Sequence, residues 1–302
     1  MAIPFNRDFD VPYGEPIRLT PLVARVLARN PGPFTFKGTG VYIVGAGDPK
    51  RGVAVIDPGP LIPEHIAALK RALEGRRVSH ILLTHTHSDH SPAAQPLKEW
   101  SGARTYAFGP HGPPSSKSGR EDGVKTEEGG DRDFVPDVRV RDGDVLEGDG
   151  WTVECVFTPG HTSNHMCYAL KDEKALFTGD HVMGWSTTVV TPPDGDMADY
   201  MASLRKLLAR DDRILYPTHG GPVRDPRPFL QAYIDHRRER EAQILAAIGD
   251  GLTTIPEMVA CIYANVDKRL HPAAARSVEA HLIQLEREGR VTGDSVRYSL
   301  TK

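Results

Sequence analysis

Three features are scarce in this sequence: cysteine, long apolar runs and an excess of charge of one sign. Its 302 residues include three cysteines, Cys155, Cys167 and Cys261, and none has C-x-x-C spacing. This pattern argues against a disulfide framework and a thiolate zinc site, so reduced thiols are expected. The 37 basic and 40 acidic residues give a net charge of −3, so no global attraction to polyanions is expected. No apolar stretch approaches the roughly 20 residues that span a bilayer, so the chain predicts a water-soluble protein without a membrane partner.

The first residues also lack a targeting pattern. Residues 1–8 contain neither a basic stretch followed by an apolar core nor an Arg-rich amphipathic pattern. We therefore expect a cytoplasmic location. Apolar residues make up 39% and charged residues 25%, which is ordinary globular usage. The length predicts one large domain with a small appendage.

Short β-branched runs alternate with helical segments in the first part of the chain, which predicts an α/β catalytic domain over residues 1–228. The predicted strands are 40–44, 53–56, 81–84, 151–157, 175–178 and 214–217. Apolar residues at helical spacing predict helices over 63–73 and 197–208. The stretch 109–134, rich in Gly, Pro and polar residues, predicts a long exposed loop.

A different pattern begins near residue 229. A charged helix is predicted over 229–248, followed by a capping box at Thr254 and a further helix that begins at Pro272. Two short alternating segments around a Gly-Asp turn then predict a hairpin over 290–300. Three helices followed by a hairpin are typical of a winged helix, so residues 229–302 are predicted to form that small domain.

The segment from Ile81 to His90 carries the strongest chemical signal. An apolar run leads directly into His85, His87, Asp89 and His90. Such groups are costly to bury unless they bind something, so packing alone does not explain them. Histidine with carboxylate suits zinc, and also manganese or iron. The spacing lets His85 and His87 converge on one cation while Asp89 and His90 reach a second.

Three further segments place a metal-binding side chain after an apolar run. These are Thr158-Pro-Gly-His161, Thr178-Gly-Asp180 and Tyr216-Pro-Thr-His219. Each alone is compatible with an ordinary turn after a strand. With the first cluster, they give five histidines and two aspartates at predicted strand ends, where α/β folds commonly keep their active sites.

This full set resembles the metallo-β-lactamase superfamily, whose H-x-H-x-D-H signature is matched by residues 85–90. The resemblance covers about residues 17–225 and implies an αββα sandwich, with a pair of metal ions at one edge. It assigns His85, His87 and His161 to the first metal and Asp89, His90 and His219 to the second. It also implies catalytic roles for Asp180 as the bridging ligand and for Asp89 as a proton acceptor. A hydroxide between two divalent ions, zinc above all, would be the nucleophile.

Three more residues are candidates for positions next to the metal ligands. By the same resemblance, Asp57 would orient a ligand histidine, although an Asp that initiates the turn before Pro58 is the alternative. His165 and His181 could contact the substrate or hold a ligand; the alternative is that both are loop histidines without a role.

Differences between this sequence and the antibiotic-degrading β-lactamases narrow the group of enzymes that it resembles. Antibiotic-degrading members usually place cysteine where this chain has Asp180, and they lack the histidine at His90. The pattern resembles the hydrolase type shared by thioesterases, lactonases, sulfatases and nucleases. The segments 158–166 and 179–187 and the C-terminal helices resemble the subgroup of β-lactamase-like protein 2, which includes single-strand endoribonucleases.

Three functions follow as hypotheses. The first is a dinuclear hydrolase of an ester-type small molecule, such as a thioester or lactone, or of a phosphodiester. The second is an endoribonuclease with single-stranded RNA as its partner. The third is a metal- or ligand-sensing regulator whose winged helix binds DNA.

The charge of the C-terminal region weighs against nucleic acid, because residues 224–302 hold twelve Lys and Arg against eleven Asp and Glu. Only a cluster of Arg276, Arg287, Arg290 and Arg297 on one face would change this. A winged helix that braces the wall of the site or forms a homodimer contact is the alternative. The segments 109–134 and 183–193, with Trp185, are expected to build the walls that select the substrate.

Overall fold

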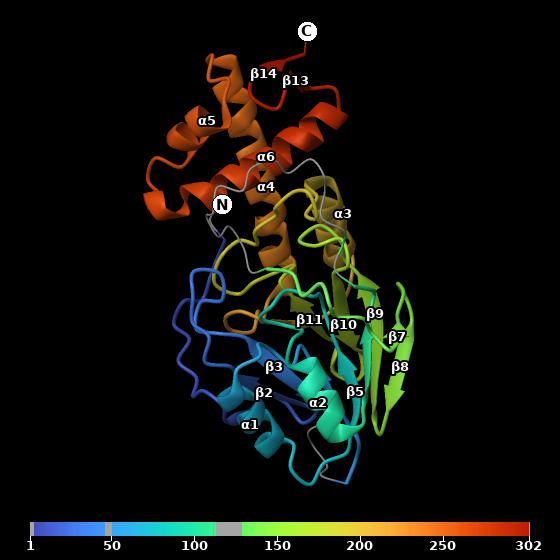
Figure 1. Ribbon diagram of the computed structural model, residues 1–302. Coiled ribbons are helices and arrows are strands. Elements are labelled where there is room, and N and C mark those ends of the chain that lie inside the picture. Colours follow the sequence, from blue (N-terminus) through green and yellow to red (C-terminus); the bar gives the residue numbers. More distant parts are fainter. Residues whose placement is uncertain (1–2, 46–49, 111, 113–128, 302) are drawn as a thin grey trace.

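The computed structural model describes residues 3–45, 50–110, 112 and 129–301. Two β-sheets lie face to face, with helices on both outer faces (Figure 1). This is the αββα sandwich that the resemblance implied. A helical domain sits at one end of the sandwich and ends in a two-stranded hairpin. No described helix is long and apolar enough to cross a membrane.

The larger sheet contains strands from the N-terminal half of the chain. In spatial order these are β1 (Pro16–Arg18), β2 (Val23–Leu27), β3 (Gly40–Val44), β4 (Val53–Ile56), β5 (Val78–Leu82), β6 (Arg104–Ala107) and β7 (Val138–Arg139). Strands β1 to β4 pair in antiparallel fashion and β4 to β7 in parallel. Helices α1 (Pro63–Ala72) and α2 (Ala94–Ser101) cover its outer face (Figure 1).

The smaller sheet also mixes both pairings. Its spatial order is β12 (Ile214–Pro217), β11 (Ala175–Gly179), β10 (Met166–Leu170), β9 (Trp151–Phe157) and β8 (Val145–Gly148). Only β11 and β12 pair in parallel. Residues of β10 alternate between two cores: Met166, Tyr168 and Leu170 face the other sheet, whereas Cys167 and Ala169 face the helices on the outside. This period of two fixes which strand faces are buried.

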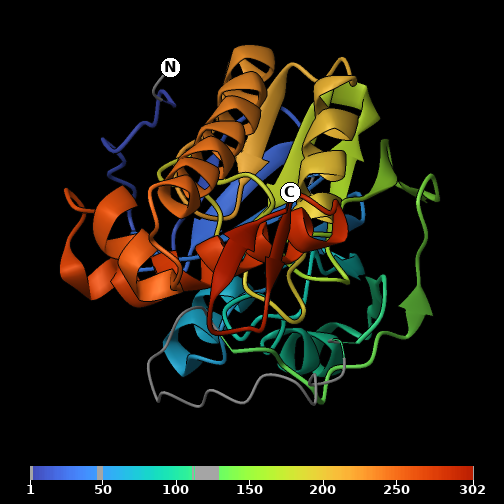
Figure 2. The same cartoon turned by 90° about the horizontal axis from the view of Figure 1, so that it is seen from above.

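Helices α3 (Met197–Leu208) and α4 (Pro226–Gly249) cover the smaller sheet side by side (Figures 1 and 2). The helix predicted over 229–248 begins three residues earlier, because Pro226 suits the first helical position, where its missing N–H is not needed. Phe229 and Tyr233 pack on the smaller sheet, whereas Ile244 and Ile248 belong to the core of the C-terminal domain. One helix therefore contributes side chains to both cores.

The C-terminal domain has the predicted order. Its elements are the end of α4, α5 (Ile255–Ile262), α6 (His271–Arg287), β13 (Val291–Gly293) and β14 (Tyr298–Leu300), with a short 3-10 helix at Lys268–Leu270. Val278, Leu282 and Leu285 of α6 are buried in its own core, as the helical spacing predicts. Helix α2 and the strands β1, β2, β6, β7, β8 and β10 were not predicted from the sequence pattern. It also placed β5 at 81–84, but this strand ends at Leu82, and the N–H of Thr84 binds the carboxylate of Asp57 instead.

Replacing Thr254 by alanine is expected to lower the free energy of unfolding by about 1 kcal/mol. The Thr254 hydroxyl accepts the N–H of Glu257, and the Glu257 carboxylate accepts the N–H of Thr254, as the sequence predicts for a capping box. Denaturant unfolding of the Thr254→Ala variant measures the loss, with Thr253→Ala as the control just outside the box. Equal stability of the two variants would contradict this role.

Candidate metal centre

All seven predicted metal ligands meet at one edge of the sandwich, at the ends of strands. His85, His87, Asp89 and His90 lie in the loop after β5, and His161 lies between β9 and β10. Asp180 directly follows β11 and His219 follows β12. Every one of these side chains is buried. The fold therefore gathers residues that are up to 134 positions apart in the chain.

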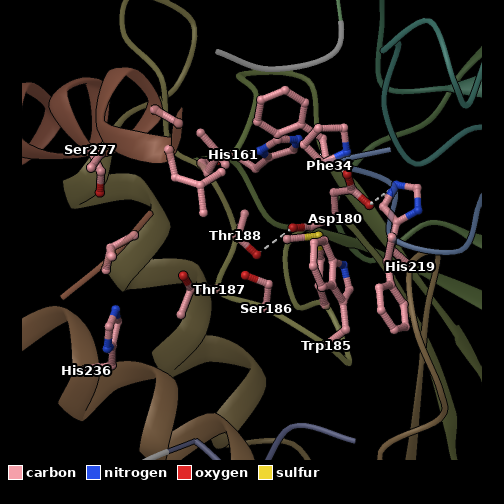
Figure 3. Close-up of a pocket in the computed structure, with 18 of the residues that line it drawn as sticks. Phe34, His161, Asp180, Trp185, Ser186, Thr187, Thr188, His219, His236 and Ser277 are labelled. Atoms are coloured by element: carbon pink, nitrogen blue, oxygen red, sulfur yellow. Dashed lines mark hydrogen bonds and ion pairs between the residues drawn. The ribbon is translucent and has the colours of Figure 1, made fainter. Parts of the chain in front are cut away.

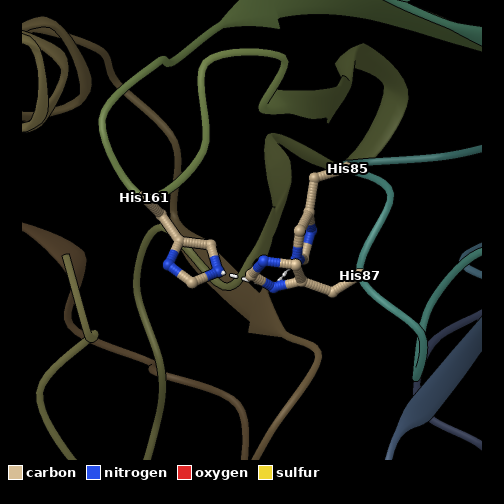
Figure 4. A group of neighbouring side chains, drawn as sticks. All are labelled: His85, His87 and His161. Carbon is tan, nitrogen blue, oxygen red and sulfur yellow. Dashed lines mark hydrogen bonds between the residues drawn. The ribbon is translucent and has the colours of Figure 1, made fainter. Parts of the chain in front are cut away.

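The first group consists of His85, His87 and His161, whose rings surround one point (Figure 4). His85 Nε2 lies 3.0 Å from His87 Nδ1, and His161 Nε2 lies 3.2 Å from that same atom. Three ring nitrogens that converge in this way are the donor set of a tetrahedral metal site with one position left for another ligand.

The second group consists of Asp89, His90 and His219. Asp89 Oδ2 is 3.1 Å from His219 Nε2 and 3.4 Å from His90 Nε2. Asp180 lies between the two groups: its Oδ1 is 3.3 Å from His219 Nε2 and 3.6 Å from His90 Nε2, and its Oδ2 is 3.9 Å from His161 Nε2. Asp180 thus has the position of a shared ligand.

The opposite ring nitrogen of four histidines is held by the protein. His161 Nδ1 donates to the Val189 carbonyl at 2.7 Å and His219 Nδ1 donates to the Gly38 carbonyl at 3.1 Å. His90 Nδ1 donates to Asp57 Oδ2 at 2.9 Å, and His85 Nδ1 is 3.1 Å from the Thr84 hydroxyl. Each proton on Nδ1 leaves the Nε2 lone pair aimed at the cluster, which is the arrangement of metal-binding histidines.

Unsatisfied buried atoms support the same interpretation. Asp89 Oδ1, Asp180 Oδ1 and His90 Nε2 are buried and have no hydrogen-bond partner among the described residues. Buried polar atoms in folded proteins are normally paired with protein, water or an ion. The donor set, with imidazole nitrogens on both sides of Asp180 and the Asp89 carboxylate on one side, fits two divalent cations.

The ionisation of the two groups differs. Burial, followed by the neighbouring imidazoles, lowers the pKa of His85 and His87 well below the usual value. Burial also acts to lower the pKa of His219, but Asp180 and Asp89 outweigh it and raise it to about 10. Burial acts to raise the pKa of Asp89, but His90 and His219 lower it. The first group is therefore neutral and the second is an ion-paired cluster, so cation binding there displaces protons.

Asp57 lies directly behind the second group. Its Oδ1 accepts the N–H of Thr84 at 2.7 Å, and its Oδ2 accepts the Thr84 hydroxyl at 2.7 Å, His90 Nδ1 at 2.9 Å and the Thr218 hydroxyl at 3.2 Å. Its φ of 49° lies in the left-handed region, which Asp tolerates better than most residues. Asp57 both turns the chain before Pro58 and orients His90.

The two remaining candidate histidines have different surroundings. His165 Nε2 accepts the N–H of Asp180 at 3.3 Å, so its proton is on Nδ1 and is directed to the Thr158 hydroxyl at 2.9 Å. His165 therefore holds the backbone of a ligand. The ring of His181 packs against Tyr200 at 4.6 Å, and neither of its nitrogens has a partner among the described residues. Among the described residues, His181 forms no hydrogen bond with a metal ligand.

A cavity of about 630 Å³ opens from the metal centre toward the C-terminal domain (Figure 3). Near the centre its walls are aromatic, with Phe34, Phe36 and Trp185; Phe36 and Trp185 stack at 4.7 Å. Farther out, Val266 and Leu270 of the C-terminal domain close it. Of the predicted wall segment 183–193, Met183 and residues 185–189 line the cavity, whereas residues 190–193 do not. Most of the predicted loop 109–134 lies outside the described residues.

The C-terminal domain forms part of the cavity wall, and α6 packs against the catalytic domain. Ala280 of α6 belongs to the same core as Leu204 of α3. The predicted cluster of four arginines is not a free basic patch. Arg276 pairs with Glu279, Arg287 with Asp196, and Arg290 with Glu241 and Glu288. These ion pairs neutralise the charges of three of the four arginines within the protein.

Several lining residues had no recognisable signal in the sequence. Thr188 and Val189 lie in the predicted wall segment 183–193, but no sequence signal indicated that they hold ligands through a hydroxyl and a backbone carbonyl. His236 and Arg237 belong to a helix with an ordinary charged pattern. Phe34 and Phe36 lie far from the ligand motifs in sequence. Only long-range packing shows that they share one cavity.

Comparison with known proteins agrees with this geometry. Residues 36–219 match the model of the Metallo-beta-lactamase superfamily, and residues 254–297 match the Beta-lactamase associated winged helix domain. The lactamase-like protein adaB of Aspergillus niger is 30% identical over 293 residues, which cover 91% of this chain and 83% of that protein. An atrochrysone carboxyl ACP thioesterase of Aspergillus fumigatus is 34% identical over 267 residues, which cover 82% and 75%.

A solved structure agrees over nearly the whole chain. A beta-lactamase domain protein from Burkholderia ambifaria superposes with a TM-score of 0.77 at 20% identity, over 98% of this chain and 96% of that one. At this identity the likeness shows the fold. With the matched family model, the relatives and the arrangement of the ligands, the chain belongs to the metallo-beta-lactamase superfamily and is one of its hydrolases, with an associated winged-helix domain.

Proposed function

We propose that this protein is a dinuclear metal-dependent thioesterase that releases a bulky acyl group from a carrier thiol. One observation carries the proposal: a cavity of about 630 Å³ leads from the metal centre into walls formed by Phe34, Phe36, Trp185, Val266 and Leu270. The aromatic walls next to the metal centre suit an apolar acyl chain better than a phosphodiester, which calls for basic side chains beside the scissile bond, whereas the basic residues of α4 line the far side of the cavity. The relationship to a thioesterase that covers 82% of this chain supports the same class.

The reaction adds water to the thioester carbonyl carbon, breaks the carbon–sulfur bond and gives a carboxylic acid and a free thiol. When bound, two divalent ions at these ligands would polarise the carbonyl and lower the pKa of water. The protein holds the ligands in place through His165 behind Asp180 and Asp57 behind His90. Asp89 Oδ1 has no partner among the described residues and is the carboxylate oxygen open to a proton from water. The cavity walls exclude bulk water from the acyl group.

The structure weighs against the other two hypotheses. A DNA-reading winged helix inserts its third helix into the major groove. Here α6 is that helix, and its Ser277, Ala280 and His281 are buried. Three of the four arginines considered for RNA phosphates, Arg276, Arg287 and Arg290, are paired with acids of the same chain.

Turnover by metal-loaded protein tests the proposal. We expect hydrolysis of acyl N-acetylcysteamine thioesters, with kcat/KM rising up to roughly fourfold for each added methylene from acetyl to octanoyl as the chain enters the apolar cavity. A fluorescent single-stranded RNA should remain intact. The His87→Ala variant is the control for contaminating activity. It removes the ring nitrogen that lies near both His85 Nε2 and His161 Nε2 in the first group. Cleavage of RNA without thioester turnover would refute the thioesterase and favour the endoribonuclease.

A further inference from the structure

The wall of the cavity opposite the metal centre carries three basic side chains of α4, namely His236, Arg237 and Arg240. We call these three residues the basic wall. Figure 3 shows His236 and Ser277 on the helices at one side of the cavity, with Asp180 and His219 at the other. A ligand that fills the cavity therefore touches the metal centre with one end and the basic wall with the other.

Arg237 is a buried cation, 3% exposed. Its guanidinium donates to the Thr188 carbonyl, lies 3.5 Å from the Ser277 hydroxyl and sits 5.0 Å over the ring of Tyr200. Its Nε has no partner in the described part of the chain. Among the described residues no carboxylate forms an ion pair with it, although a buried charge is costly unless it is paired.

Arg240 is similar. Its guanidinium lies 4.8 Å over the ring of Tyr263 and donates to the Gln243 side chain, and no ion pair with an acid is found for it among residues 3–45, 50–110, 112 and 129–301. The histidines beside these arginines respond to the same surroundings. Burial, then Arg237, lowers the pKa of both His236 and His281 to about 3. This part of the cavity therefore holds two arginine cations without an acidic partner among the described residues, beside neutral histidines.

One segment connects the basic wall to the metal ligands. The Thr188 hydroxyl donates to the Asp180 carbonyl at 2.8 Å, and the Thr188 carbonyl accepts from Arg237. The next carbonyl, that of Val189, accepts His161 Nδ1. Arg237 therefore contacts the same short segment, Thr188 and Val189, that holds the metal ligands Asp180 and His161.

We propose that the basic wall binds a carboxylate on the far end of the acyl part of the substrate. The inference rests on the proposed thioesterase function. The other anion on such a substrate is the phosphate of a carrier protein, but that phosphate is attached directly to the folded carrier and stays at its surface. A side chain that is 3% exposed on the inner wall of a cavity is placed for the acyl group instead.

Matched substrates test the proposal. The set consists of N-acetylcysteamine thioesters of straight-chain dicarboxylic acids from adipic to sebacic acid, each beside its methyl ester. At the best length we expect kcat/KM for the free acid to exceed that for the methyl ester by about tenfold or more, as for a hydrogen bond to a charged group. Arg237→Gln should abolish this preference and Arg237→Lys should retain part of it. Arg238→Gln, an exposed neighbour on the same helix, should behave like the wild type.

A purely structural role for Arg237 gives a different result. If Arg237 only holds the Thr188 carbonyl, Arg237→Gln lowers the rates for acid and ester equally, and the proposal is overturned. It is also overturned if the variant instead loses a preference for the phosphopantetheine thioester over the N-acetylcysteamine thioester of octanoate, which would place the phosphate at this wall. If Arg237→Gln fails to fold, the same comparison of acid and ester is made with His236→Gln and Arg240→Gln, because these two side chains are less buried.

A binding measurement separates this inference from the thioesterase itself. Calorimetry on metal-free protein should give a Kd for suberate about tenfold higher in Arg237→Gln than in the wild type, and dimethyl suberate should show no such difference. Suberate binding that depends on Arg237 without turnover of any thioester would refute the thioesterase and keep the anion site. Thioester turnover with neither a preference for the acid nor suberate binding that depends on Arg237 would refute the anion site and keep the thioesterase.

Discussion

Replacing Asp180 by asparagine is expected to lower thioester turnover by about a thousandfold or more and to reduce the metal content of the purified protein. Among the described residues, Asp180 is the carboxylate that faces both groups of ligands, with Oδ1 3.3 Å from His219 Nε2 and Oδ2 3.9 Å from His161 Nε2. Asparagine keeps the size of the side chain but removes the charge that two cations share. The loss of several kcal/mol of transition-state stabilisation gives this magnitude.

Metal analysis and kcat/KM on the same preparation check the prediction. Asp211→Asn is the matched control, because Asp211 is exposed and pairs only with Lys174 among the described residues. The control should retain both metal and activity. An Asp180→Asn variant with full metal content and full turnover would show that the charge of this residue has no part in catalysis. Full metal content with low turnover would place its effect on the reaction rather than on metal binding.

Replacing Asp57 by asparagine is expected to weaken binding of the second metal by about 10- to 100-fold. Asp57 Oδ2 fixes the proton of His90 on Nδ1, and this leaves His90 Nε2 directed at the cluster. An amide is a weaker acceptor, and its N–H₂ faces donors that it cannot satisfy. We therefore also expect the metal-free protein to lose about 2 kcal/mol of unfolding free energy. Asparagine tolerates the φ of 49° at this position, so the backbone should keep its turn.

Competition with a chromophoric chelator measures the metal affinity, and denaturant unfolding of the metal-free protein measures the stability. Thr218→Val is the matched control, because it removes one hydroxyl that donates to the same carboxylate at 3.2 Å and leaves the contact with His90 intact. Its expected effect on metal affinity is below twofold. If Asp57→Asn binds both metals as tightly as the wild type does, Asp57 serves only as the residue that turns the chain before Pro58.

Parts of the fold that depend on local pattern were predicted well. The helix over 197–208 and the strands over 40–44, 53–56, 151–157 and 214–217 have the predicted bounds, because their apolar residues alternate or repeat with a single clear period. The capping box at Thr254 depends on residues three positions apart, and it formed as expected. By contrast, α2 lacks a capping side chain, and β7 is two residues long, so neither left a readable pattern.

The metal ligands were predicted from residue chemistry and not from periodicity. Ligand chemistry restricts the side chains that can occupy such a site to very few types, so His85, His87, Asp89 and His90 were recognisable within six positions. Distant ligands such as His219 followed from the chain order of a known family. Asp57 and His165, which hold ligands in place, were named as candidates, and only their hydrogen bonds distinguish them from His181.

The sequence by itself determined an α/β domain and the winged-helix order of the C-terminal elements through local periodicity, and the types of the metal ligands through residue chemistry. The αββα class followed from the resemblance to a known family. Only the tertiary structure decided what surrounds the metals. It places α6 against the catalytic domain, pairs Arg276, Arg287 and Arg290 with acids, and brings Arg237 beside Thr188, 49 positions away. The physical reason is that cavity shape and charge compensation arise from packing between distant segments, and no local pattern records which distant side chains will meet.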